Sequence, residues 1–330
     1  MIKMKKTTKD DLLGTNSLEE AVKLLFGVKI KGRQKVLLEE TFSPEVGAAY
    51  DFIGRCFRSG TYESIADDFI VRIFGDSERD VTEREKYQQR IKKDYTKRVP
   101  SPRILDVGCG TGLLSIALAE KFEVADIVGM DISPAMIGMA KENCTLAFNI
   151  DSPHRKSMDV NVHFEEGNIN ELPFYVQKAA SFVIRPDHAH VDYIICRNVL
   201  HRLDDPALAL QKMYETLSTE GKLYLRDLRR DARWRDLKLR IVGGYRIGDG
   251  AFVDEEQEKM WFPELLKDKI GAMVNTFTRQ ELVELLESSG IKKYTISDGK
   301  HLQPWPFNCQ DHTPEYAQEV EFVCVIEKSK

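Results

Sequence analysis

A short glycine-rich segment constrains the fold of this chain more than any other feature. Residues 104–107, mostly apolar, predict a buried strand, and glycines follow at positions 108, 110 and 112 before a helix expected from Leu113 to Lys121. Glycine has no Cβ, so the backbone can turn sharply there and approach a ligand closely. The segment therefore predicts a strand, a ligand-binding turn and a helix in direct succession, as at the start of a doubly wound α/β sheet.

The spacing of the three glycines distinguishes between two kinds of ligand. The dinucleotide fingerprint G-x-G-x-x-G would need a glycine at position 113, where the sequence has Leu113. The observed spacing, G-x-G-x-G, is the one expected around S-adenosylmethionine (SAM), which has no pyrophosphate. The turn therefore favours SAM over NAD, provided that further cofactor contacts follow along the chain.

The second predicted strand supplies one such contact. An apolar run over residues 127–130 ends at Asp131 and Ile132, and Ser133 then caps a helix whose first residue is Pro134. A carboxylate at this place can accept hydrogen bonds from both hydroxyls of a ribose. Asp131 is therefore a candidate ligand of the adenosyl group.

The third and fourth predicted strands also end in polar residues. The third ends near Glu166 and leads to Asn168 and Ile169, a polar and an apolar residue that can hold the edge and the face of an adenine ring. The fourth breaks at Asn198 and His201. Since parallel strands bring their carboxyl ends to one edge of a sheet, these residues should gather beside the glycine turn.

These motifs together resemble a known family. Residues 102–228 look like the core of the class I SAM-dependent methyltransferases, in the small-molecule group that includes the quinone-ring methyltransferases. The resemblance rests on D-x-G-C-G-T-G, the acid after the second strand, G-N-x-x-x-L-P-F, N-V-L-H-x-L and L-x-x-E-G-x-L. It implies a Rossmann-like α/β fold with a doubly wound, seven-stranded sheet, and SAM as the cofactor.

The resemblance also implies cofactor-binding roles for individual residues. Asn168 stands where the family usually has Asp, so its contact with the adenine amino group carries no charge and should be weaker. Asp131 would bind the ribose, with Ile132 beside it, and Asn198 is a further candidate. The positions expected around the methionine part of SAM are Asp106, Gly108, Gly110 and Gly112.

Methyl transfer itself makes few demands on side chains, because the sulfonium already activates the methyl group. Placing the nucleophile against it can contribute roughly 7–11 kcal/mol, and an oxygen or carbon nucleophile also needs a base. His201 is the first candidate for that base, although the family often uses this histidine structurally. Asp227 and Tyr245 are weaker candidates.

Tyr62 is the second catalytic candidate. Residues 62–69 resemble a Y-D-x-I-A-x-x-Y-D segment that folds over the cofactor in several small-molecule methyltransferases. The same pattern also fits an ordinary amphipathic helix that packs through Ile65 and Phe69. The two interpretations differ in whether Tyr62 lies beside the methyl group.

Residues 229–276 are expected to be an insertion after the fifth strand, at the edge where open α/β sheets bind ligands. An insertion of this length favours a substrate cover or a dimer contact. Its candidate substrate residues are Arg229, Arg230 and Tyr245. Arginine forks recognise carboxylates and phosphates, and an aromatic ring can line an apolar pocket. The arginine run that opens it fits a solvated helical face equally well. That run comprises Arg226, Arg229, Arg230, Arg233, Arg235, Arg240 and Arg246.

The rest of the chain completes the plan. Residues 1–100 are expected to form a helical N-terminal region with the lid, and residues 101–330 the SAM-binding domain. A capping box at Ser17 opens a helix that reaches Phe26, and further helices are expected over residues 44–60 and 83–97. After the insertion, the sequence predicts a helix from Arg279 to Ser288 capped by Thr278, a strand from Lys293 to Ser297 and a final antiparallel strand within Tyr316–Glu327.

Composition limits the class of protein. The sequence has no apolar run of about 18 residues, and its basic start lacks the apolar region of a secretory signal. Its six cysteines include no C-x-x-C pair, so the chain is expected in the reducing cytoplasm without a structural metal. The net charge of −5 argues against a nucleic-acid partner. A small-molecule substrate and a homodimer are the partners expected. The alternatives are an RNA-modifying methyltransferase and a SAM-binding partner subunit without activity.

Overall fold

The computed structural model describes the sheet, the helices that cover it and part of the N-terminal region. Everything below refers to the residues that it describes, which are 11–12, 14–27, 29, 47, 51, 62–74, 102–122, 125–148, 160–172, 190–234, 237, 268–299 and 320–329. The helices expected over residues 44–60 and 83–97 lie outside this set, apart from positions 47 and 51.

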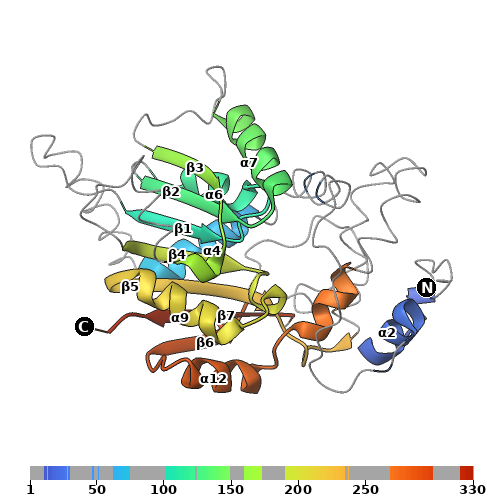
Figure 1. Ribbon diagram of the computed structural model, residues 1–330. Coiled ribbons are helices and arrows are strands. Elements are labelled where there is room, and N and C mark those ends of the chain that lie inside the picture. The colour runs from blue at the N-terminus through green and yellow to red at the C-terminus, as the bar shows by residue number, and fades with distance from the viewer. Residues whose placement is uncertain are drawn as a thin grey trace, which may run out of the picture.

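A seven-stranded sheet forms the centre of the molecule, in the order β3-β2-β1-β4-β5-β7-β6 (Figure 1). The first five strands in the chain run parallel, and β7 lies antiparallel between β5 and β6. This arrangement confirms the doubly wound α/β fold predicted from the sequence. The strands are β1 Arg103–Val107, β2 Ala125–Asp131, β3 Val160–Glu166, β4 Val191–Arg197, β5 Leu217–Leu228, β6 Tyr294–Asp298 and β7 Glu321–Glu327.

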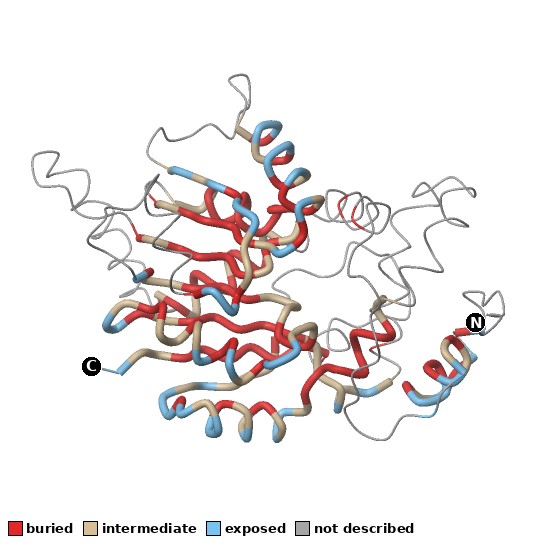
Figure 2. Tube along the Cα trace, viewed as in Figure 1, coloured by how far each residue is buried: buried red, intermediate tan, exposed pale blue. Residues whose placement is uncertain are grey.

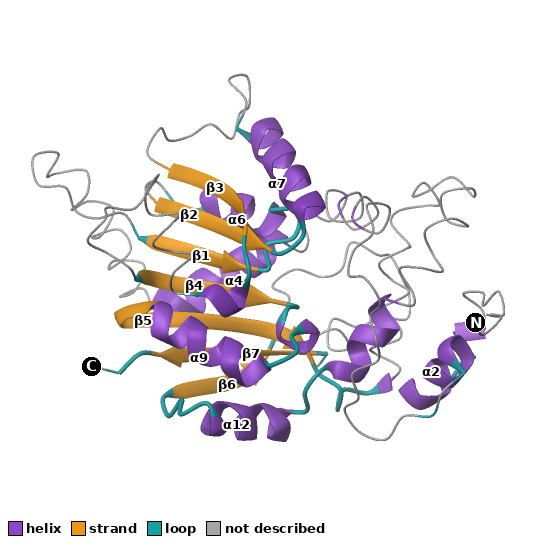
Figure 3. Cartoon of the chain, in the orientation of Figure 1, coloured by secondary structure: helices purple, strands orange, loops and turns teal. Residues whose placement is uncertain are grey.

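Helices cover both faces of the sheet (Figure 3). On one face, α4 (Glu63–Phe74) and α6 (Leu113–Ala119) bury apolar side chains against β1, β4 and β5, and α7 (Pro134–Ala147) packs beside α6 over β2 and β3. On the other, α9 (Pro206–Thr216) and α12 (Arg279–Ser288) close a second core. The inner strands β1 and β4 are buried along most of their length, whereas β3 at the sheet edge has several exposed residues (Figure 2).

Local capping explains where several helices begin. Thr278 and Glu281 form the reciprocal capping box of α12, whose bounds are those predicted from the sequence. Asp205 caps α9, and Pro206 occupies its first turn, where proline costs no hydrogen bond. Residues 217–219 already belong to β5, which reaches its regular pairing with β4 after Glu220 takes a left-handed backbone conformation.

The N-terminal helix α2 (Leu18–Phe26) lies at the end of the sheet and not on either face (Figure 1). Ser17 caps it as predicted, but the Glu20 side chain accepts from the backbone of Asn16 and not from that of Ser17. Its apolar face packs against helical residues 268–275, the final part of the predicted insertion. No helix in the described ranges is long and apolar enough to span a membrane.

Candidate functional site

The strand order reverses between β1 and β4, because the chain winds from β1 outward to β3 before it crosses back. Open α/β sheets bind ligands at the carboxyl ends of the strands on either side of such a reversal. Val107 and Cys196 pair there, so Gly108 and Arg197 come next on the two neighbouring strands. The glycine turn, Asp131 and the end of β4 therefore lie at one edge, as predicted.

The three glycines of the turn all have a positive φ, which side chains rarely allow. A Cβ at Gly108 would lie 2.2 Å from Val199, and one at Gly112 would lie 2.6 Å from Phe164, so these two glycines permit close packing. A Cβ at Gly110 would meet no atom of the described residues within 4 Å. Gly110 is thus the position of the turn at which the described residues leave room for a ligand.

Asp131 links the turn to the end of β2. One carboxylate oxygen accepts from the backbone N–H of Gly110 at 2.9 Å, and the other accepts from that of Ser133 at 2.9 Å. Each oxygen retains a further lone pair. Burial raises the pKa of Asp131, and the backbone N–H groups around it together with the charge of Arg202 partly offset that rise. The carboxylate is therefore held rigidly, with capacity left for two more donors.

Asp106 lies below the turn and is almost completely buried, with 2% of its surface exposed. The Ser115 hydroxyl donates to it at 2.6 Å. Burial raises the pKa of Asp106 to about 7, and the charge of Asp131 adds to this rise. No ion pair compensates Asp106 among the described residues.

The residues predicted around the adenine take different positions. Ile132 is 62% exposed, unusual for a large apolar side chain, and lies directly after Asp131. The Asn168 carbonyl accepts from the backbone N–H of Asn170, so it caps the 3-10 helix Ile169–Glu171. Ile169 packs in the core with 8% of its surface exposed. Ile132 thus presents the open apolar surface at this point, and the adenine contacts of Asn168 and Ile169 stay predictions.

Unsatisfied polar atoms gather at the end of β4. Five buried side-chain nitrogen or oxygen atoms lack a hydrogen-bond partner in the described part of the chain, and three of them belong to Arg197, Asn198 and His201. Asn198 is also in the left-handed region, with φ 56°, which is strained for a residue other than glycine. An unpaired buried polar group costs about 1–3 kcal/mol. Such a concentration of strain and unpaired groups is typical of a binding site.

His201 forms a buried pair with Asp227 at this edge. Its Nδ1 lies 2.6 Å from Oδ1 of Asp227, and its backbone N–H donates to the other oxygen at 3.3 Å. The Asp227 carboxylate can only accept a hydrogen bond, so it favours the tautomer that carries the proton on Nδ1. In that tautomer Nε2 keeps its lone pair. Nε2 is buried and has no partner among the described residues. The arrangement can accept a proton at Nε2.

Tyr62 lies directly before α4. Its ring faces the Arg197 guanidinium, with 5.4 Å between Cζ and the ring centroid, so Tyr62 is next to the end of β4. Ile65 and Phe69 are fully buried in the core of that face. The packing interpretation therefore holds for these two residues, whereas a lid role and a catalytic role for Tyr62 stay predictions.

The arginines at the start of the insertion are held by acids. Arg229 pairs with Asp231 and Asp298, and Arg230 pairs with Glu281. Their predicted contact with a substrate is untested, as is that of Tyr245, which lies outside the described residues together with Arg235, Arg240 and Arg246.

Arg226 corrects the prediction of a solvated arginine face. It is fully buried, because the alternation of β5 turns it toward α4, where it binds Glu321 and Asp68. No sequence spacing identifies these partners, which lie 95 and 158 residues away. Arg197 at the end of β4 was not among the predicted site residues, although its place directly before Asn198 was a usable signal.

Comparisons with known proteins find relatives among methyltransferases. A family model described as a methyltransferase domain matches residues 99–290. Phosphoethanolamine N-methyltransferase 3 of Arabidopsis thaliana is 29% identical over 229 residues, covering 62% of this chain and 41% of the relative.

Ubiquinone biosynthesis O-methyltransferase of Xylella fastidiosa is 29% identical over 143 residues, covering 42% and 48%. The chain spans about half the length, or less, of the curated relatives it matches. A solved structure of the plantazolicin methyltransferase BpumL aligns over 87% of this chain and 90% of its own, with 17% identity and a TM-score of 0.47.

Proposed function

The chain belongs to the methyltransferase domain family, in the class I group that uses SAM, and from this we propose that the protein methylates a small molecule. SAM supplies a methyl group that its sulfonium activates for direct displacement. The residues present fit this cofactor, since the described residues leave room at Gly110 and form no ion pair with the two acids beside the turn. The protein then has to bind the cofactor, orient the acceptor against its methyl group and remove a proton from the acceptor.

Asp131 is the proposed ribose ligand. Its two oxygens already accept from Gly110 and Ser133, which fixes the carboxylate in one orientation. The remaining lone pairs can accept from the two ribose hydroxyls without further ordering of the side chain. Ile132 offers its exposed surface to the adenine, and Asn198 offers a side-chain oxygen without a partner among the described residues. Asp106 and the glycine turn are left for the methionine part.

The His201–Asp227 pair is the observation that carries the proposal of acceptor activation. The carboxylate holds the proton on Nδ1, so that Nε2 can take a proton from an acceptor hydroxyl or amine. Asp227 acts as a positioning residue, because it orients the imidazole and stabilises its protonated form. Tyr62 is the second candidate for contact with the acceptor.

The proposed acceptor is a small molecule with an anionic or aromatic group. The sequence of the insertion combines arginines with large aromatic residues directly after β5, the strand that ends at the edge where open α/β sheets bind ligands. One relative is named for phosphoethanolamine and another for the biosynthesis of ubiquinone, and both compounds are small molecules. These names support the class of the acceptor and leave the methylated atom open.

A transfer assay tests the proposal. The full chain is incubated with methyl-labelled SAM and with two fractions of a cell extract, one of small metabolites and one of RNA. We expect label in the small-metabolite fraction only. Label in RNA would favour the RNA-modifying alternative, and SAM binding without any transfer would favour a partner subunit without activity.

The His201→Gln variant then tests the base. A positioned base typically contributes 10²–10⁴-fold, so kcat should fall by about that factor while the Kd for SAM stays near the wild-type value. The Asp131→Ala variant is the control with the opposite pattern, since it should weaken SAM binding. An unchanged kcat in His201→Gln would assign this histidine a structural role.

A further inference from the structure

Arg197 differs from the other arginines near this edge. Its guanidinium has no hydrogen bond or ion pair within the described ranges, and its buried Nε is one of the unpaired atoms. Four neighbours are all matched by acids: Arg202 by Asp268, Arg226 by Glu321, Arg229 by Asp298 and Arg230 by Glu281. Arg197 is half-buried, so it holds at the site a charge that none of the described residues pairs.

The position of Arg197 is defined by the sheet. It follows the pair Val107–Cys196 and therefore stands beside Gly108, at the start of the glycine turn. Its charge lowers the pKa of Asp106, against the larger effect of burial, so the two opposite charges are close enough to interact although no bond joins them. The Arg197 guanidinium and the Asp106 carboxylate therefore lie near each other below the turn without a hydrogen bond between them.

Tyr62 holds Arg197 without using its N–H groups. The ring lies under the guanidinium at 5.4 Å, an attractive cation–π contact that leaves the donors free. Tyr62 is in turn fixed by α4, which begins directly after it.

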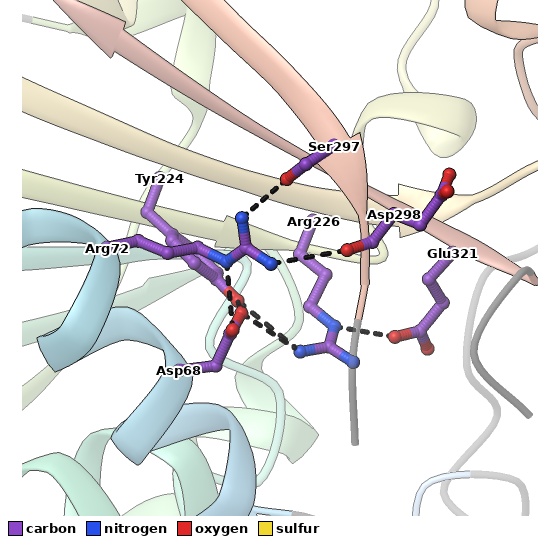
Figure 4. A network of polar contacts seen from close by, with 7 residues as sticks. All are labelled: Asp68, Arg72, Tyr224, Arg226, Ser297, Asp298 and Glu321. Atoms are coloured by element: carbon purple, nitrogen blue, oxygen red, sulfur yellow. Dashed lines mark hydrogen bonds and ion pairs between the residues drawn. The ribbon is translucent and has the colours of Figure 1, made fainter. Parts of the chain in front are cut away.

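Polar contacts pin α4 to the far half of the sheet. Figure 4 shows Arg72 and Arg226 both directed at the Asp68 carboxylate, which also accepts from the Tyr224 hydroxyl at 2.6 Å. Arg72 reaches on to Ser297. The Tyr62 ring therefore stands on an anchored helix and supports the Arg197 guanidinium from one side.

We propose that Arg197 binds the α-carboxylate of the methionine part of SAM, with Asp106 on the side of the α-ammonium group. An amino acid carries these two charges on one carbon, and the unpaired Arg197–Asp106 arrangement has the complementary signs. The proposal rests on the proposed function, since it assigns a residue to the same cofactor. An anionic group of the acceptor has similar chemistry, and the choice of probes separates the two.

The test compares ligands with and without the carboxylate. Arg197→Met keeps an unbranched side chain that can still pack on the Tyr62 ring, and it removes the charge and the N–H donors. By calorimetry, the Kd values for SAM and S-adenosylhomocysteine should rise about tenfold to a hundredfold, as expected for the loss of charged hydrogen bonds. The Kd values for decarboxylated SAM and methylthioadenosine, which lack the carboxylate, should stay within about threefold of wild type.

Arg103→Met is the matched control. Arg103 begins β1 at the opposite end of the same strand pair and is bound by Asp192, so its loss should leave all four affinities near wild type. Circular dichroism establishes that both variants fold. Equal weakening of all four ligands, or unchanged SAM binding, would overturn the inference, and so would a rise in the acceptor's KM alone. If the wild-type chain itself fails to bind SAM, the proposed function fails with it.

Discussion

Two groups of buried and half-buried acids in this protein have different surroundings. In the half of the sheet around β5–β7, Asp68 and Glu321 are matched by Arg72 and Arg226 in a network that joins α4 to three strands. At the glycine turn, Asp106 and Asp131 have hydrogen bonds but no ion pair among the described residues. The first group is balanced by arginines of the fold, whereas the second contacts no cation among the described residues, and we propose that the cofactor supplies one.

The contrast separates charges that hold the structure from charges that bind. A buried carboxylate without a cation is costly, and its pKa rises as a result, as it does for Asp106. SAM brings a sulfonium and an ammonium group, which are the opposite charges to these acids. The turn therefore holds in the free protein a strain that the cofactor would relieve.

The largest effect is expected where a matched charge is removed. Arg226→Met should destabilise the protein by about 3–5 kcal/mol, because Asp68 and Glu321 remain buried with less compensation. Urea unfolding measures this loss. The double variant Arg226→Met, Glu321→Gln should recover part of it, since it removes the opposite charge as well. A loss below about 1 kcal/mol would show that the network contributes little.

Removing an unmatched charge should have the opposite sign. Asp106 has a pKa of about 7 in the folded protein, against 3.8 ordinarily. Between these values the folded protein keeps a proton that the unfolded chain has released, so stability falls as pH rises from about 4 to 7 and then levels off. The slope can reach roughly 1.4 kcal/mol per pH unit.

Asp106→Asn is the variant that checks this slope. It should flatten that part of the pH profile and be more stable than wild type at pH 8 in urea unfolding without cofactor. The same slope in the variant would assign the pH dependence to another group.

The two groups also differ in how far the sequence could predict them. The glycine turn, Asp131 and the His201 motif are local patterns, and the structure places all of them at one edge. The cap at Thr278 and the bounds of its helix were predicted for the same reason, since residues within one turn determine them, and the structure adds the reciprocal contact of Glu281. Local geometry is encoded by residues that are close in the chain.

The arginine network had no such local signal. Arg226 resembled one more member of an exposed run, because Glu321 and Asp68 reach it only through the pairing of β5 with β7 and the packing of α4. Arg197 was missed in a different way. Arg197 stands out because none of the described residues pairs with its guanidinium. That property depends on the positions of the surrounding side chains, which the sequence does not give.

A direct test of the binding group is Asp131→Ala. Hydrogen bonds to a charged acceptor are each worth about 1.5–3 kcal/mol, so SAM affinity should fall at least tenfold in calorimetry. Asp131→Asn is the matched control, because it keeps the shape and one acceptor oxygen and should lose less. Normal SAM binding by Asp131→Ala would remove this residue from the site. It would also contradict the proposal that the acids at the glycine turn bind the cofactor.

The smallest effect is expected for charges that are matched but partly exposed. Arg229 and Arg230 bind Asp298 and Glu281, whose side chains are 45% and 33% exposed, so water screens both pairs. Such pairs are worth about 0–1 kcal/mol each. Replacing both arginines by Ala should therefore cost little stability and leave SAM affinity within about threefold. We also expect an unchanged KM for the acceptor, because the guanidinium groups are engaged by acids of β6 and α12. A tenfold rise in that KM with unchanged SAM binding would contradict this, and would show that the acceptor draws these arginines away from their acids.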